Sequence, residues 1–119
     1  MESLKKNSDF KNCYNNGKSY VNRLLVMYVC GGRPEKNRFG ISVSKKVGNS
    51  VVRHHVTRLI RESVRLHEKE LDTGYDVVIV ARVRAGEADF FKIESAFLKL
   101  AKKAGIRRSN SKNDEKNND

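Results

Sequence analysis

Apolar positions recur at helical spacing in three stretches of the chain, and strand-like apolar segments lie between them. The first stretch predicts a short helix, which Asn7 or Ser8 can cap and which is expected to end near Gly17. Phe10 and Tyr14 are four residues apart and therefore share one face of this helix. These two rings either pack into the core or offer a surface to a ligand.

Two segments that follow predict strands. Residues 20–30 are rich in Val, Leu, Met and Tyr on both faces, so this strand is expected to be covered on both sides, with an interruption at Asn22–Arg23 left open. Residues 38–44 alternate large apolar side chains with Gly40, Ser42 and Ser44. The face with small side chains either leaves room for a ligand on the sheet or faces solvent.

A basic turn and a long helix come next. Lys45 and Lys46 flank the turn, Gly48 permits a positive φ angle, and Asn49 or Ser50 can cap a helix that continues to about Leu71. Free backbone N–H groups at such a helix start, beside two lysines, favour an anion.

The long helix carries two separate faces. One is mostly apolar, and the other places four side chains at i, i+4, i+7 and i+11, namely His54, Arg58, Arg61 and Arg65. This basic stripe is either a solvated face or a contact for a polyanion, because guanidinium groups pair with phosphate oxygens bidentately. Arg53 borders the apolar face and is expected to reach back over the sheet.

The remaining elements complete one domain. Residues 75–83 contain a continuous apolar run typical of a buried strand, so that strand, helix and strand form a crossover unit. Residues 87–104 predict the last helix. Residues 1–7 are expected to be a frayed polar segment, and residues 105–119 a polar, disordered tail.

Composition narrows the class of partner. The chain has 119 residues and a formal net charge of +11, which favours nucleic acid. No apolar run approaches the roughly 20 residues of a membrane-spanning helix, and no signal for secretion precedes the domain. We therefore expect a cytoplasmic protein without membrane contact, in which Cys13 and Cys30 are reduced thiols rather than a disulfide.

The sequence predicts no catalytic residues and no metal site. Its 14 acidic residues fall in no motif with a known mechanism. His54 and His55 are adjacent, and adjacent helical side chains point about 100° apart, so both could not flank one phosphate. His67 is expected to be a packing residue.

The stretch from Gly40 to Arg53, GISVSKKVGNSVVR, followed by Arg58-Leu59-Ile60-Arg61, resembles the signature of the bacterial ribonuclease P protein subunit. The resemblance extends in order over about residues 4–104, including Asn22–Arg23. It implies an α+β fold, a single-domain α-β sandwich over residues 1–104. Its element order is αβββαβα, with a four-stranded sheet and a βαβ crossover through the basic helix.

The resemblance also implies a function and its partners. The subunit assists a catalytic RNA, bound 1:1, in cutting the 5′ leader from precursor tRNA, with Mg²⁺ ions held mainly by that RNA. Residues matching the family's leader-binding cleft are Phe10, Tyr14, Tyr28, Ser42 and Arg53. Residues matching its RNA-binding helix and turn are Lys45, Lys46, Asn49, Arg53, His54, Arg58, Arg61 and Arg65.

The chain departs from the family pattern where Arg-Asn-Arg is usual, because it has Arg53-His54-His55. We therefore expect RNA affinity to rise below about pH 6.5, as histidine side chains gain charge. Two other functions are compatible with the composition. One is a stand-alone, ribosome-associated RNA-binding protein; the other is a histidine-dependent ribonuclease, which cleaves without an RNA subunit.

Overall fold

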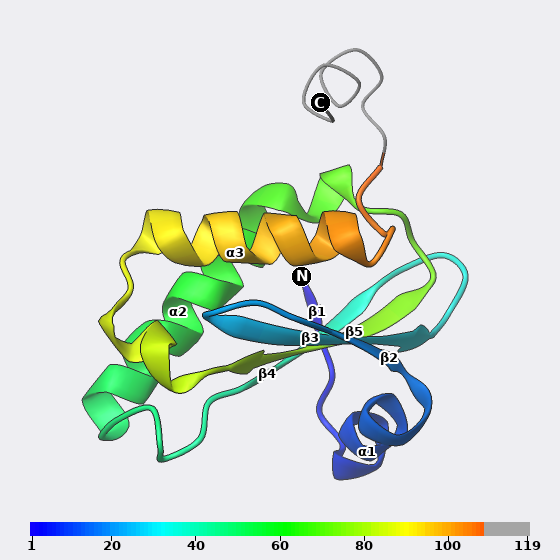
Figure 1. Ribbon diagram of the computed structural model, residues 1–119. Helices are drawn as coiled ribbons and strands as arrows, with labels where there is room; N and C mark the ends of the chain where they lie inside the picture. The colour runs from blue at the N-terminus through cyan, green and yellow to red at the C-terminus, as the bar shows by residue number, and fades with distance from the viewer. Residues whose placement is uncertain (109–119) are drawn as a thin grey trace.

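The structure is a computed structural model that describes residues 1–108. These residues form one mixed α+β domain (Figure 1). In chain order its elements are β1 (Glu2–Ser3), α1 (Asn7–Asn16), β2 (Lys18–Val21), β3 (Leu25–Gly31), β4 (Arg38–Ser42), α2 (Ser50–His67), the 3-10 helix η1 (Glu68–Glu70), β5 (Tyr75–Ala81), the 3-10 helix η2 (Val83–Glu87) and α3 (Phe90–Lys103).

A single sheet with strand order β1-β4-β5-β3-β2 forms the centre of the domain. β4 and β5 are parallel and are joined through α2, as the predicted crossover requires. β5 pairs antiparallel with β3, and β3 with β2. The continuous apolar run of β5 is explained by its central place, since both of its faces are covered.

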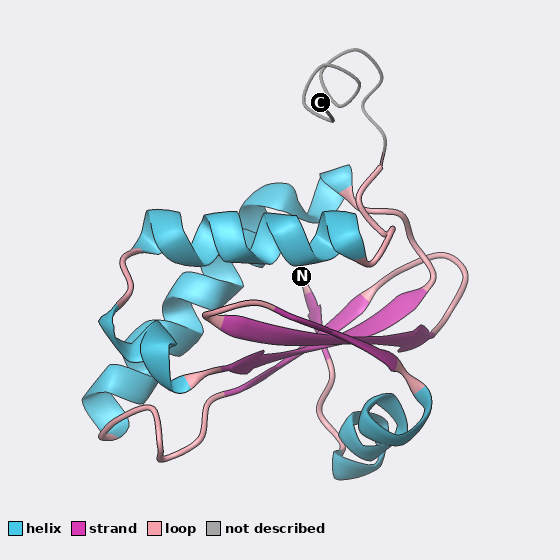
Figure 2. Ribbon diagram, in the orientation of Figure 1, coloured by secondary structure: helices cyan, strands magenta, loops and turns pink. Residues whose placement is uncertain are grey.

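The sheet separates two apolar layers. α2 and α3 cover one face and α1 covers part of the other, as Figures 1 and 2 show. The larger layer contains Phe39, Val56, Ile60, Ile79 and Phe97, all almost fully buried. In α2, residues 56, 60 and 64 recur every four positions and supply its buried face, so the apolar periodicity predicted this layer correctly.

The predicted strand 20–30 is divided by a turn at Asn22. The Asn22 side-chain oxygen accepts hydrogen bonds from the backbone N–H groups of Leu24 and Leu25, at 3.2 and 3.0 Å. Its amide nitrogen donates to the Ala96 carbonyl on α3, at 3.0 Å. This one side chain therefore closes the β2–β3 hairpin and ties it to the last helix.

The number of strands differs from the four expected. Residues 1–7 were predicted to be frayed, but Glu2 and Ser3 form β1, which pairs parallel with β4. The backbone N–H of Leu4 donates to the Phe39 carbonyl at 2.9 Å, and the Leu4 side chain is buried beneath α1. Burial of this one leucine holds the strand in place, and so short a strand has no alternation to reveal it.

The start of α1 also differs from the prediction. Lys6, rather than Asn7 or Ser8, occupies the N-cap position, and no side chain caps the helix. When several polar residues that could cap a helix are adjacent in sequence, the sequence does not show at which residue the helix begins. Tertiary packing decides this, because it sets the path of the chain that leads into the helix.

The packed domain extends past the predicted boundary at residue 104. Gly105 adopts a positive φ of 76°, and Ile106 is buried in the main apolar layer. Arg107 forms a β-bridge with Leu71. The prediction of a disordered tail from residue 105 is thus wrong for residues 105–108, and its remainder lies outside the described residues.

Candidate nucleic-acid interface

The start of α2 is fixed by Asn49. Its side-chain oxygen accepts from the Val52 N–H at 3.0 Å, and its carbonyl accepts from the Arg53 N–H at 2.9 Å. The predicted cap is confirmed. Gly48 does not adopt a positive φ angle, however. Among the glycines of the described residues, only Gly74 and Gly105 do so. A Cβ at Gly48 would lie 2.8 Å from the Val52 Cβ, so close packing is what requires glycine there.

The predicted basic stripe lies on the exposed side of α2. His54, Arg58, Arg61 and Arg65 are all exposed, opposite the buried residues of the helix. Arg65 is engaged by Glu62, which accepts from the Arg65 Nε at 3.0 Å. That hydrogen bond holds the pKa of the Glu62 carboxyl below its ordinary value. Within residues 1–108, Arg58 and Arg61 form no ion pair and can each take a phosphate.

The turn before α2 contributes two further cations. Lys45 and Lys46 are exposed, and the turn is closed by a hydrogen bond from the Val47 N–H to the Ser44 carbonyl, at 3.1 Å. Arg53 is half-buried, and its guanidinium donates to the Gly48 carbonyl at 2.9 Å. This bond holds the Arg53 side chain against the turn, so the predicted reach over the sheet is not what the structure shows.

The aromatic residues of α1 meet the sheet. The rings of Tyr14 and Tyr28 form an edge-to-face pair with centroids 4.9 Å apart. Phe10 lies over Gly40 so closely that a Cβ at that position would be 2.6 Å from the phenyl Cζ. The small face of β4 is therefore partly filled by Phe10, while Tyr14 stays 39% exposed.

A row of residues beside α1 stays open. The strand register aligns Val21 with Val26, Val26 with Val80, and Val80 with Ser42 across four strands. We call these four residues the open row. None of them is fully buried, and Val21 is 46% exposed. The neighbouring register row contains Tyr28 and Gly40, which meet Tyr14 and Phe10 of α1.

Comparison with known proteins assigns the chain to a family. A family model described as Ribonuclease P matches residues 1–105. The chain belongs to this family. It is 54% identical over 104 residues to the "Ribonuclease P protein component" of Clostridium botulinum strain 657, covering 87% of this chain and 94% of the relative. Identity to the protein of the same name from Lachnoclostridium phytofermentans is 55% over 101 residues, covering 85% and 87%.

Solved ribonuclease P proteins have the same fold. The Staphylococcus aureus protein matches with a TM-score of 0.82 at 34% identity, covering 91% of this chain and 99% of that one. The Thermotoga maritima protein matches with a TM-score of 0.79 at 28% identity, covering 87% and 97%. The α+β sandwich implied by the resemblance is thereby confirmed, with β1 as an additional strand.

The residues that the ribonuclease P resemblance assigned to a leader cleft are only partly brought together. Phe10, Tyr14 and Tyr28 lie in one layer between α1 and the sheet, and Ser42 is on the same sheet face. Arg53 is positioned by the turn before α2 instead. Sequence reasoning missed Val21, Val26 and Val80, because only the register of non-adjacent strands aligns them with Ser42.

The sequence also did not predict an ion-pair network beneath α1, formed by Arg38, Asp76 and Asp9. Arg38 donates to both carboxylate oxygens of the buried Asp76, at 3.0 and 2.7 Å, and lies 3.6 Å from Asp9 of α1. The hydrogen bond to Asp76 raises the pKa of the Arg38 guanidinium further. This ion pair joins β4, β5 and α1, and so positions the helix that carries the aromatic rings.

Within residues 1–108, no group of three His, Cys, Asp or Glu side chains is placed to hold a metal ion. His54 and His55 are exposed, and neither forms an ion pair in that part of the chain. None of the helices in the described residues has the length and apolar character to cross a membrane.

Proposed function

We propose that this protein is the non-catalytic subunit of ribonuclease P. It binds the catalytic RNA through the basic stripe of α2 and holds the single-stranded 5′ leader of precursor tRNA on the open row. The observation that carries this proposal is the uncovered strip of sheet beside Tyr14 and Tyr28. Aromatic side chains next to an apolar floor accept unpaired bases of any sequence, and each stacked base contributes on the order of 1–3 kcal/mol.

The two RNAs are assigned to different surfaces because those surfaces differ in chemistry. Arg58 and Arg61 are exposed cations on one face of a helix, which suits the phosphates of a folded RNA. The open row is mostly apolar and ends at the polar Ser42, which suits bases rather than phosphates. Protein and catalytic RNA act 1:1 in this proposal, since one copy of the domain presents one surface of each kind.

The chemistry of cleavage is assigned to the RNA. The Mg²⁺ ions that drive leader removal are held mainly by the RNA, and the described part of the protein offers no cluster of ligands for them. The protein contributes positive charge and positions the leader. The leader is held in place, and phosphate repulsion between the two RNAs is reduced.

The decisive experiment is cleavage of a precursor tRNA at low Mg²⁺ by a bacterial ribonuclease P RNA, with and without this protein. We expect cleavage at the mature 5′ end only when both are present. If the RNA gains nothing while the protein still binds tRNA, the protein is a stand-alone RNA-binding protein. Cleavage by the protein alone would indicate a histidine-dependent ribonuclease.

A variant pair tests the role of the stripe. Arg58→Gln/Arg61→Gln is expected to weaken binding of the catalytic RNA on the order of tenfold or more, with a smaller dependence on salt. Lys102→Gln/Lys103→Gln removes the same charge from the exposed end of α3 and serves as the matched control. Equal losses in both variants would show that net charge, rather than the stripe, binds the RNA.

A further inference from the structure

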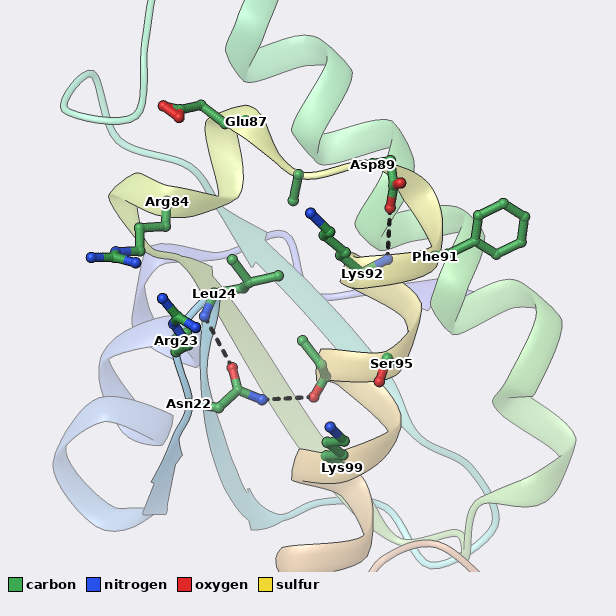
Figure 3. A pocket seen from close by; sticks show the side chains of 12 residues that line it. Asn22, Arg23, Leu24, Arg84, Glu87, Asp89, Phe91, Lys92, Ser95 and Lys99 are labelled. Atoms are coloured by element: carbon green, nitrogen blue, oxygen red, sulfur yellow. Dashed lines mark hydrogen bonds between the residues drawn. The ribbon is translucent and has the colours of Figure 1, made fainter.

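A groove separate from the open row lies between the β2–β3 turn and α3. Its volume is about 970 Å³, and Figure 3 shows the side chains that line it. Leu24, Ala88 and Ala96 provide apolar lining, and Asn22 joins the two walls through its hydrogen bond to the Ala96 carbonyl. Neither the basic stripe nor the residues of the leader cleft line this groove.

Basic side chains outnumber acidic ones in the lining of the groove. Four cations lie along it, and all four are exposed: Arg23, Arg84, Lys92 and Lys99. In the described part of the chain none of the four is in an ion pair. In Figure 3 the side chains of Arg23, Arg84 and Lys92 gather around Leu24.

Two acidic side chains also line the groove but do not neutralise it. Asp89 accepts from the Lys92 backbone N–H at 2.9 Å and thereby caps α3. Glu87 points outward at one end of the groove, as Figure 3 shows. Phe91 also points outward, away from the cations, although it is 74% exposed. Unpaired cations beside an apolar surface are complementary to a single-stranded nucleic acid.

The groove begins where the open row ends. The row crosses the sheet from Ser42 to Val21, and the residue after Val21 is Asn22, which lines the groove. At the same end of the sheet, Arg82 follows β5 and donates to the Asn22 carbonyl at 2.7 Å. A strand of RNA that crosses the row on the α1 face therefore arrives at the β2–β3 turn, and it reaches the groove on the α3 side by passing around this edge of the sheet.

We propose that this groove binds the upstream part of the 5′ leader, after the leader has crossed the open row. The inference rests on the proposed function, because it extends the path of the same strand. Four strands span about 15 Å at the usual spacing, so the row holds only a few nucleotides. Longer leaders reach the groove, where their phosphates meet the four cations.

The test measures the affinity of the holoenzyme for precursor tRNAs with leaders of increasing length. For the unaltered protein we expect affinity to rise first as the leader lengthens across the open row. We expect a second gain in affinity once the leader extends past the row and reaches the groove. Lys92→Gln/Lys99→Gln is expected to abolish this second gain, which we place at about tenfold. Affinity for precursors with short leaders is expected to stay unchanged.

The matched control is Lys102→Gln/Lys103→Gln, which removes two cations from the same helix outside the groove. It is expected to retain the second gain. If Lys92→Gln/Lys99→Gln retains it as well, or if the unaltered protein shows no second gain, the groove assignment is wrong. Stimulation of cleavage is a separate readout, so this failure is distinguishable from failure of the proposed function.

Photo-crosslinking distinguishes the leader from the catalytic RNA as the occupant. A photoreactive uridine near the cleavage site is expected to crosslink to the peptide containing Tyr28. The same nucleotide placed further upstream is expected to crosslink to the peptide containing Lys92. Crosslinks from the catalytic RNA to the Lys92 peptide, without any from the leader, would overturn the proposal.

Discussion

The imidazole of His67 joins the two helices that cover one face of the sheet, because its Nε2 lies 2.7 Å from a carboxylate oxygen of Glu94 on α3. Its Nδ1 lies 2.6 Å from Glu70, in the short helix that follows α2. Burial disfavours the charged ring, but the hydrogen bonds to Glu94 and Glu70 outweigh it and raise the pKa of His67 above 6.5. The sequence predicted His67 to be a packing residue and did not reveal its ion pairs with Glu70 and Glu94.

This relationship predicts a dependence of stability on pH. Because the folded state raises the pKa of His67, the stabilisation is fully present below about pH 6.5 and is lost as the pH rises through the folded value. His67→Gln is therefore expected to lower the free energy of unfolding by on the order of 1 kcal/mol more at about pH 6 than at about pH 9. Urea titrations at both pH values measure the difference.

The control for this prediction is His55→Gln, which removes an exposed histidine from the same helix. Its effect on the free energy of unfolding is expected to be the same at both pH values. A His67→Gln variant that behaves in the same way would show that the two carboxylates do not stabilise the charged ring.

Gly40 is expected to tolerate no side chain. A Cβ there would lie 2.6 and 2.7 Å from two atoms of the Phe10 ring, so Gly40→Ala must displace α1 or the ring. We expect a loss of about 1–3 kcal/mol in the free energy of unfolding. Gly31→Ala is the control, since nothing lies within 4 Å of a Cβ at that position. Equal thermal stability of the two variants would contradict the close packing of Phe10.

The ion pair between the partly exposed Arg38 and the buried Asp76 is expected to contribute strongly to stability. Arg38→Leu leaves the Asp76 carboxylate, only 4% exposed, without its partner. Removing one member of a buried pair costs about 3–5 kcal/mol. Lys36→Leu breaks the more exposed pair with Glu2 and is expected to cost much less, because water screens that pair. Urea denaturation of both variants decides whether burial causes the difference.

The two cysteines are expected to differ in reactivity although their sulfur atoms lie 2.7 Å apart. Cys13 is fully buried, and burial, together with the hydrogen bond to Cys30, raises the pKa of its thiol. Cys30 is only partly buried. Alkylation of the folded protein, followed by mass spectrometry of its peptides, is expected to modify Cys30 first. Rapid modification of Cys13 in a Cys30→Ser variant would contradict the predicted protection.

Local patterns in the sequence determined much of the fold. The four-residue spacing of Val56 and Ile60 predicted the buried face of α2, because a helix repeats every 3.6 residues whatever it packs against. The capping role of Asn49 was also predictable, since a cap involves only the next few residues. The exposed arginines of α2 followed from the same periodicity.

Tertiary structure alone decided the contacts between distant segments. The open row exists because β2, β3, β5 and β4 adopt one register, and a shift of one residue would turn every side chain to the other face. Cys13 and Cys30 meet because α1 docks on β3, and His67 and Glu94 meet because α2 and α3 pack against each other on the other face of the sheet. The sequence by itself determined which faces are apolar and which are basic. Which of those faces meet was decided by packing, since that depends on residues far apart in the chain.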